Sequence, residues 1–267
     1  MKPELVILNG RLGLAAGSRN EPEDAIGVFE TLEVAGGRPQ RFDEHADRFA
    51  AGCRYYGLSS APTAAEIAVA AGDLIDARAE IVGPEGVLRW SAWSSALQGS
   101  GWQIRFEPSR PDTAKPVWRV AVSPLRIPEP GPEARFKHLG RRMWREALAL
   151  GKAAGLEEVL LADRSGLLVE GSRANVFVEL DGRLWTPAPD LGLLPGVVRA
   201  NVIAFAAELA MPVQEGRISL AELGAAEGMF FTNSLIGIKP VSELDGQALP
   251  GGGELISRLM TAWRSRR

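Results

Sequence analysis

The fold is decided by residues 157–180, which read EEVLLADRSGLLVEGSRANVFVEL. Two apolar runs, 158–162 and 167–170, flank a polar turn and predict a β-hairpin. A third run, 175–180, predicts a further strand that ends at the turn residues Asp181 and Gly182. Glu170 closes the second run just before a glycine, so an acidic side chain stands at the end of an otherwise apolar strand.

Further elements lie on both sides of this stretch. Strands are predicted over 5–9, 28–34, 87–92, 102–106, 117–122 and 228–232, and helices over 44–56, 64–79, 141–155, from 195 onward and over 254–264. The helix over 44–56 is well marked. Asp43 is its predicted N-cap, Ala46, Phe49 and Cys53 share one face, and Gly57 ends it.

A proline-rich connection separates two groups of elements. Residues 108–132 hold seven prolines, interrupted by the strand over 117–122. Because proline withholds a backbone donor and restricts the residue before it, such a density suits a link between domains. We expect two domains, a small N-terminal one over 1–114 and a larger C-terminal one over 115–267.

The composition predicts a globular protein with a small-molecule ligand. Of 267 residues 46% are hydrophobic and 24% charged, and the net charge of −3 gives no basic field for nucleic acid or an anionic membrane. The apolar runs are too short to span a bilayer and the N-terminus lacks a secretory signal, so we expect a cytoplasmic protein. One cysteine and two histidines argue against a disulfide or a zinc cluster, so we expect no metal.

Two residues have side chains suited to chemistry. Lys137 follows the proline-rich connection in the run ARFKHLG, among several other basic residues. Cationic neighbours can activate a lysine as a nucleophile or Schiff-base partner, although the same run also fits a solvated basic helix start. Glu170 has the chemistry to pair with a protonated ring nitrogen of a cofactor, or it is a hairpin-end glutamate that faces water.

Two later segments are candidate anion sites. Residues 194–199, LPGVVR, open a helix whose first N–H groups suit a phosphate, or they form an ordinary Pro-Gly helix start. Residues 232–234, Thr-Asn-Ser, follow an apolar strand and either hold a phosphate or carboxylate or cap a turn. The informative feature is the order: a lysine, an acid, a helix start and a hydroxyl group.

Taken in this order, the segments resemble the class IV family of pyridoxal-phosphate enzymes, which includes D-amino-acid and branched-chain aminotransferases. The likeness covers nearly the whole chain and extends to LWTP over 184–187, KPV over 239–241 and GVFETL over 27–32, followed by His45 and Arg48. The resemblance implies the two-domain α+β architecture of fold type IV, with a small α/β N-terminal domain and a larger C-terminal domain that has a mainly β core.

The resemblance also implies a role for each matching residue. Lys137 would be the catalytic residue that forms the Schiff base with pyridoxal phosphate, and Glu170 would pair with the ring nitrogen. The phosphate would be held by Arg48, the backbone N–H groups of Val197 and Val198, and the hydroxyl of Ser234, with Asn175 in the same cofactor-binding set. The helical pattern alone places Arg48 on the solvated side of its helix.

The substrate-binding residues are predicted on the same basis. We expect Arg89 and Asn233 near substrate carboxylates, and Phe29 and Thr31 along the pocket, whereas the residues alone leave open that Arg89 is a surface arginine at a strand end. Family members build the active site between domains and complete it with a second subunit, so the resemblance implies a homodimer.

Within the family, two features favour an aminodeoxychorismate lyase. These are the run KHL over 137–139 and the run TNSLIG over 232–237. The loop over 94–102 lacks the Arg-x-His carboxylate trap of D-amino-acid transaminases, but also the Arg-Gly pair usual in both groups. Two further positions count against the lyase: Gly140 replaces a common asparagine, and Arg141 stands where transaminases tend to have tyrosine.

The predicted reaction is the conversion of 4-amino-4-deoxychorismate to 4-aminobenzoate and pyruvate. The alternative is an aminotransferase acting on D- or branched-chain amino acids with a 2-oxo acid. A more distant alternative is a non-catalytic member of the fold that only binds a ligand.

Overall fold

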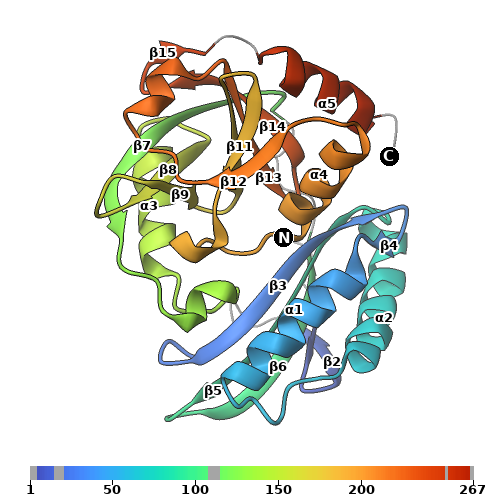
Figure 1. Cartoon of the computed structure of the whole chain (residues 1–267). Helices are drawn as coiled ribbons and strands as arrows, with labels where there is room; N and C mark the ends of the chain where they lie inside the picture. Colours follow the sequence, from blue (N-terminus) through green and yellow to red (C-terminus); the bar gives the residue numbers. More distant parts are fainter. Residues whose placement is uncertain (1–4, 15–20, 108–114, 250–251, 265–267) are drawn as a thin grey trace. The chain divides into compact units, whose positions relative to one another are not determined.

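The computed structural model describes residues 5–14, 21–107, 115–249 and 252–264 (Figure 1). The chain divides into two compact units: unit 1 holds Met1–Thr113 and Phe136–Gly140, and unit 2 holds Ala114–Arg135 and Arg141–Arg267. The division differs from a single boundary after residue 114, because residues 136–140 return to unit 1. The prolines at 108 and 111 of the predicted connection lie outside the described residues.

Unit 1 is a six-stranded sheet covered on one face by two helices. The strand order is β2-β1-β6-β5-β3-β4. The strands are β1 (Leu5–Leu8), β2 (Arg11–Leu14), β3 (Ile26–Ala35), β4 (Arg38–Pro39), β5 (Gly86–Ser95) and β6 (Gly99–Glu107), and the helices are α1 (Phe42–Tyr55) and α2 (Ala64–Val82). The small α+β unit predicted before residue 108 is confirmed, with β2 and β4 as additional strands.

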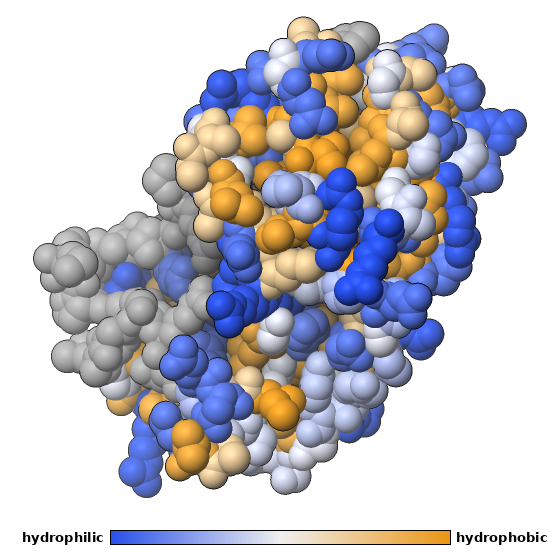
Figure 2. All heavy atoms as spheres, turned by 90° about the vertical axis from the view of Figure 1, so that its left-hand side faces the viewer, coloured by the Kyte–Doolittle hydropathy of each residue, from blue (hydrophilic) through white to orange (hydrophobic). Residues whose placement is uncertain are grey.

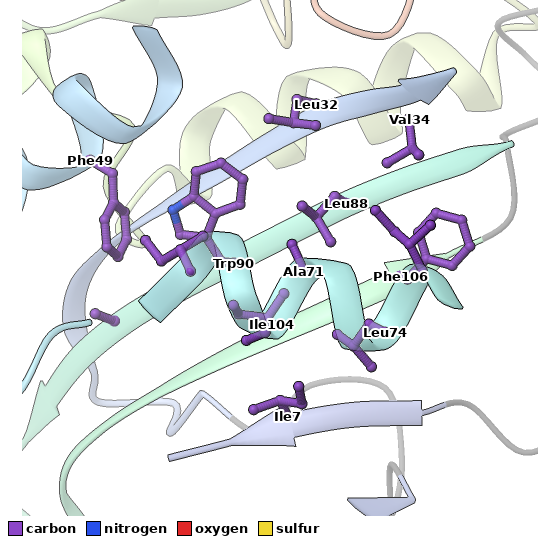
Figure 3. Packing of buried hydrophobic residues seen from close by; sticks show 14 of the residues in the cluster. Ile7, Leu32, Val34, Phe49, Ala71, Leu74, Leu88, Trp90, Ile104 and Phe106 are labelled. Atoms are coloured by element: carbon purple, nitrogen blue, oxygen red, sulfur yellow. The ribbon is translucent and has the colours of Figure 1, made fainter. Parts of the chain in front are cut away.

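The core of unit 1 lies between the helices and one face of the sheet (Figure 3). Strand side chains alternate between the two faces, so Leu32, Leu88 and Ile104 share the helix-facing side. Trp90 is fully buried there against Phe49 of α1, with 6.1 Å between ring centroids. The opposite face of these strands is therefore left for polar side chains.

Helix α1 has the predicted buried face but a different start. Ala46, Phe49 and Cys53 are buried, as the spacing predicts, and Gly57 ends the helix with a φ of 64°. The predicted N-cap is wrong, because the helix begins at Phe42 and the N-cap position is Arg41, with a φ of 54°. Asp43 instead lies in the first turn, where its carboxylate interacts favourably with the positive end of the helix dipole.

Unit 2 is a nine-stranded sheet with three helices around it. The main strand order is β12-β11-β10-β13-β14-β7-β8-β9, and β15 pairs with β14. The strands are β7 (Trp118–Ile127), β8 (Glu158–Asp163), β9 (Leu168–Gly171), β10 (Asn175–Leu180), β11 (Arg183–Pro187), β12 (Val213–Gly216), β13 (Gly228–Asn233), β14 (Gly237–Leu244) and β15 (Gln247–Ala248). The helices are α3 (Arg142–Ala153), α4 (Val197–Glu208) and α5 (Glu254–Arg264).

The apolar runs of unit 2 are buried on both faces. In β8, Leu160 packs in the cluster on one side of the sheet, whereas Val159 and Leu161 pack on the other side, towards α3. In β10, Phe177 stacks on Phe230 of β13 at 4.8 Å within a third cluster that includes α4 and α5. Continuous apolar strands are expected where both faces are covered. The predicted hairpin of β8 and β9 is confirmed as an antiparallel pair.

Helix α5 is anchored to the sheet by a buried carboxylate. Glu179 of β10 is 1% exposed and accepts the backbone N–H groups of Leu255 and Ile256, both at 3.0 Å. These donors belong to the first turn, where a helix lacks internal partners. Among the described residues, none of the helices is both long and apolar enough to cross a membrane.

Candidate active site

Lys137 lies on a short extended segment of unit 1. The N–H of Phe29 donates to the Lys137 carbonyl and the N–H of Leu139 donates to the Gly27 carbonyl, both at 2.8 Å. Residues 136–140 therefore line the edge of β3, with His138 opposite Val28 in an antiparallel bridge. The Lys137 Nζ lies 5.0 Å from the centroid of the Phe29 ring. The lysine thus starts from a strand edge and not from the solvated helix start that its sequence alone allowed.

Arg48 is held by a buried carboxylate on β3. Its Nε and Nη2 each donate to Glu30 at 2.7 Å, and Glu30 is 1% exposed. His45, one helical turn earlier, contacts the same carboxylate through Nδ1 at 2.7 Å. This bidentate pair fixes the plane of the guanidinium. The solvated position suggested by the helical pattern is wrong, because the Arg48 side chain is only 11% exposed.

Charges around Glu30 keep its carboxyl ionised. Burial alone raises the pKa, but the Arg48 guanidinium, the His45 hydrogen bond and the positive charge of Lys137 together lower it well below its usual range. Burial lowers the pKa of His45, which favours a neutral ring that donates its Nδ1 proton to Glu30. Lys137 and Arg48, predicted from the resemblance to act on one cofactor, therefore share one anionic neighbour.

Phe29, Thr31 and Arg89 lie on the face of the unit 1 sheet that points away from the helices. Thr31 pairs directly with Arg89 across β3 and β5. The Arg89 guanidinium stacks 3.9 Å from the Phe29 ring centroid and bonds Glu21 at 3.2 Å. Arg89 is not the surface arginine that its position in the sequence also allowed, because its side chain is 13% exposed.

The same face holds polar residues that were not predicted as site residues. Arg105 of β6 pairs with Arg89 across the sheet, and its Nε donates to Gln103 at 3.1 Å. Gln103 in turn donates to the Ser91 hydroxyl at 3.2 Å. Arg105, Gln103 and Ser91 are each at most 2% exposed. The alternation of polar and apolar residues in β6 was the available signal, since period-two polarity in a buried strand marks a polar face.

In unit 2, Glu170 is buried and points to the α3 side of the sheet. The register of β8 and β9 shifts so that Glu170 stands opposite Leu161, with Val169 as the extra residue. Such a bulge re-aims the side chains that follow it. The Glu170 carboxylate accepts hydrogen bonds from Arg141, from the Trp144 indole at 2.7 Å and from the Leu194 N–H at 3.1 Å. The water-facing alternative for this glutamate is wrong, since it is 2% exposed.

Two predicted site residues clamp the segment that leads into α4. Glu170 accepts the N–H of Leu194, and the Asn175 amide donates to the carbonyl of the same residue at 2.9 Å. Helix α4 begins at Val197, and Gly196 before it supplies no side-chain cap. The N–H groups of Val197 and Val198 therefore belong to the first helical turn, where backbone donors suit an anion.

Asn233 is the last residue of β13, and Ser234 follows it. Asn175 pairs with Thr232 across β10 and β13, so the turn that begins at Asn233 lies at the same edge as Asn175. The Asn233 Oδ1 accepts the N–H groups of Leu235 at 2.8 Å and Ile236 at 3.0 Å, and its Nδ2 donates to the Arg173 carbonyl at 3.1 Å. These bonds form a turn, so the predicted contact of Asn233 with a substrate carboxylate stays a prediction.

A second buried glutamate fixes the loop between β9 and β10. Glu158 is fully buried and accepts the backbone N–H of Ser172 at 2.9 Å and that of Val159 at 3.0 Å. Burial raises the pKa of this carboxyl although Arg173 is its ionic partner. Glu158 was not predicted as functional, and its contacts are those of a residue that positions the loop before Asn175.

A match to a family model defines the class of the protein. The chain belongs to the aminotransferase class IV family, whose model matches residues 27–244. Members of this family depend on pyridoxal phosphate.

Individual relatives point to more than one activity. A protein of Thermotoga maritima assigned as a branched-chain-amino-acid aminotransferase is 33% identical over 150 residues, which are 51% of this chain and 54% of that relative. The chain thus spans about half the length of the curated relatives it matches. The structure of a branched-chain aminotransferase from Thermoproteus uzoniensis matches with a TM-score of 0.83 and 25% identity, covering 98% of this chain and 94% of that one.

The lyase activity appears in the name of a solved structure. A Legionella pneumophila protein assigned as a 4-amino-4-deoxychorismate lyase matches with a TM-score of 0.81 over 94% of this chain and 97% of its own. At 22% identity this likeness shows the fold alone.

The residues present fit pyridoxal phosphate. A carboxylate such as buried Glu170 is the partner that a protonated pyridine nitrogen needs. A Cβ at Gly196 would come within 2.0 Å of the Asn175 Oδ1, so glycine allows the backbone to pass close to that amide at the start of α4. Among the described residues, no group of three or more His, Cys, Asp or Glu side chains is arranged to hold a metal ion.

Proposed function

We propose that this chain is a lyase that converts 4-amino-4-deoxychorismate to 4-aminobenzoate and pyruvate. The observation that carries the proposal is the turn after β13. Because the Asn233 side chain accepts the N–H groups of Leu235 and Ile236, the turn presents the half-buried Leu235 side chain in place of these backbone donors, while Ile236 packs in the core. Such a surface suits a carbocyclic ring better than the α-carboxylate of an amino acid.

Charge on the unit 1 sheet also supports this substrate. Aminodeoxychorismate carries two carboxylates, and Arg89 and Arg105 are paired across β5 and β6. The Phe29 ring below Arg89 adds an apolar surface beside these cations. We propose that Arg89 binds one carboxylate and that Thr31 and Phe29 line the same pocket.

In the proposed reaction, the Lys137 Nζ would hold the cofactor through its aldehyde, and the same amine would remove the proton from the amine-bearing carbon of the substrate. The cofactor supplies an electron sink at that carbon. Glu170 would hold the ring nitrogen, and Arg48, Ser234 and the N–H groups at the start of α4 would hold the phosphate. The products together contain all atoms of the substrate, so no keto acid is needed as a second substrate.

A class IV aminotransferase that acts on D- or branched-chain amino acids is the second candidate. It is supported by the names of the relatives, which include branched-chain and D-alanine aminotransferases. In that reaction Lys137 would return its proton to the cofactor, and the amino group would pass to a 2-oxo acid.

A product assay separates the two candidates. The purified chain is loaded with pyridoxal phosphate and supplied either with aminodeoxychorismate alone or with D- or branched-chain amino acids plus 2-oxoglutarate. The lyase predicts equal amounts of 4-aminobenzoate and pyruvate in the first reaction. Glutamate formed in the second reaction, with no elimination in the first, would refute the lyase proposal.

The role of Lys137 has a spectroscopic test. Lys137→Ala should abolish the visible absorbance of the cofactor Schiff base and the turnover, whereas Lys152→Ala, on the exposed side of α3, should retain both. Absorbance that persists in Lys137→Ala would remove this lysine from the site. A wild-type chain that gains no absorbance with added cofactor would support the non-catalytic alternative.

We propose that the chain forms a homodimer. The face drawn in Figure 2 is the side of α3 and β7 in Figure 1, and apolar residues gather on its upper part. In unit 2, Leu150 of α3 is 47% exposed, and Val117, which directly precedes β7, is 44% exposed. Exposed apolar surface of this kind is typical of protein interfaces. Sedimentation equilibrium should give twice the chain mass, and a monomer at micromolar concentration would refute the proposal.

A further inference from the structure

The Glu170 carboxylate is bound by two side chains from the start of α3. The Arg141 Nη2 donates to Oε1 at 2.5 Å, and the Trp144 Nε1 donates to the same oxygen at 2.7 Å. The other oxygen, Oε2, accepts the N–H of Leu194 at 3.1 Å. All four residues belong to unit 2, so this arrangement is internal to that unit.

Arg141 is fixed in place by its position at the end of the helix. It is the N-cap residue of α3, and Trp144 lies three residues later, so the two side chains point to the same side of the first turn. The Arg141 guanidinium stacks 4.6 Å from the Trp144 ring. The side chains of Arg141 and Glu170 are only 11% and 3% exposed, so water screens their charges poorly.

The geometry leaves one oxygen of Glu170 for the cofactor. A carboxylate oxygen has two lone pairs, and the two donors at Oε1 occupy both of them. Oε2 accepts one described donor, so the ring nitrogen would bond there. A carboxylate whose charge is already balanced by a guanidinium attracts a second cation less strongly.

We propose that Arg141 is a positioning residue that weakens the hold of Glu170 on the ring-nitrogen proton of the cofactor, and thereby favours elimination over amino transfer. The inference rests on the proposed function and deepens it. It assigns the choice between the two reactions to a residue that acts through the Glu170 carboxylate.

The chemical reason lies in where electrons go after Lys137 takes the proton. The electron pair of the broken C–H bond is either drawn into the cofactor ring or used at the substrate. A ring nitrogen whose proton is weakly held draws fewer electrons. The pair then forms a C=C bond, the neighbouring C–O bond breaks with its electrons on oxygen, and the enolpyruvyl group leaves and takes up a proton to become pyruvate.

The test follows the ring nitrogen directly. Wild-type chain and variants are loaded with pyridoxal phosphate labelled with nitrogen-15 in the ring, and the chemical shift of this nucleus is recorded while the pH is raised. In Arg141→Met, the pH at which the ring nitrogen loses its proton should rise by about one to three units. Arg141→Lys keeps the positive charge and should titrate as the wild type does.

Arg142→Met is the matched control, because Arg142 is the next residue and is exposed. It should leave the titration unchanged. A second readout is the fraction of cofactor converted to its amine form per turnover, which should increase in Arg141→Met and return to the wild-type value in Arg141→Lys.

The possible failures are distinguishable. If the wild-type chain binds the cofactor and makes 4-aminobenzoate but Arg141→Met titrates as the wild type does, this inference is wrong and the proposed function stands. An equal shift in Arg142→Met would also overturn it. If the wild-type chain does not bind the cofactor at all, the proposed function and this inference both fall.

Discussion

Glu30 should stabilise unit 1 by an amount that depends on pH. Its carboxylate is 1% exposed and is contacted by Arg48 through two nitrogens and by His45, all at 2.7 Å. Glu30→Gln keeps the shape but leaves the Arg48 charge without its anion. Removing one partner of a buried pair costs about 3–5 kcal/mol. We expect the lower end of that range, because the Arg48 side chain retains 11% exposure to water.

The pH dependence has a definite sign. Because the pKa of folded Glu30 lies below its ordinary value of 4.5, the stabilisation is complete above that pH and is lost as the unfolded chain binds a proton in acid. At about pH 3.5 the wild-type advantage should be roughly 1.4 kcal/mol smaller than at about pH 7. The advantage over Glu30→Gln therefore shrinks towards acid.

Hydrogen exchange of the β3 amides measures this effect locally, which matters because a chain of two units need not unfold in a single step. The control is Asp47→Asn, an exposed residue on α1 next to Arg48, which should change stability by less than about 0.5 kcal/mol. The reasoning is refuted if the β3 amides are equally protected from exchange in Glu30→Gln and Asp47→Asn. It is also refuted if the difference in protection between wild type and Glu30→Gln does not fall as the pH is lowered.

Three further predictions concern the packing of the fold. Gly151→Ala in α3 would place a Cβ 2.5 Å from a valine methyl and should lower the free energy of unfolding by about 1–3 kcal/mol in urea, whereas Gly72→Ala, with open space in α2, should raise it by up to about 1 kcal/mol. Equal effects would contradict the contact. Glu179→Ala removes the anchor of α5 and should cost about 1–3 kcal/mol, seen as faster hydrogen exchange in α5 but not in α2. Burial raises the pKa of Cys53 to about 12, so a thiol reagent should label it slowly in the native protein and rapidly in denaturant; rapid native labelling would show that it is accessible.

The elements of the fold could be predicted from sequence because their patterns are local. The strand over 175–180 and the helix over 254–264 match β10 and α5 at both ends. Strands β11, β12 and β14 were not predicted, and β12 in particular is short and has no buried residue in its pattern. The N-cap of α1 was misplaced because Arg41 adopts a left-handed backbone conformation that the pattern of side chains does not predict.

The contacts of the site were less predictable than its residues. The lysine and the glutamate are visible as an ordered pair, but their partners are set by tertiary packing. Arg141 and Glu170 are 29 residues apart, and Arg48 and Glu30 are 18 apart. No helical or strand period links such positions, so the sequence alone could not pair the cation with the acid.

The return of residues 136–140 to unit 1 has a consequence for synthesis on the ribosome. The chain leaves unit 1 after Thr113, and comes back only after strand β7 of unit 2 has been made. Until then the edge of β3 next to Val28 lacks its pairing segment, and an open strand edge invites association with other chains. A nascent unit 1 is therefore incomplete, and the last segment it receives is the one that contains Lys137.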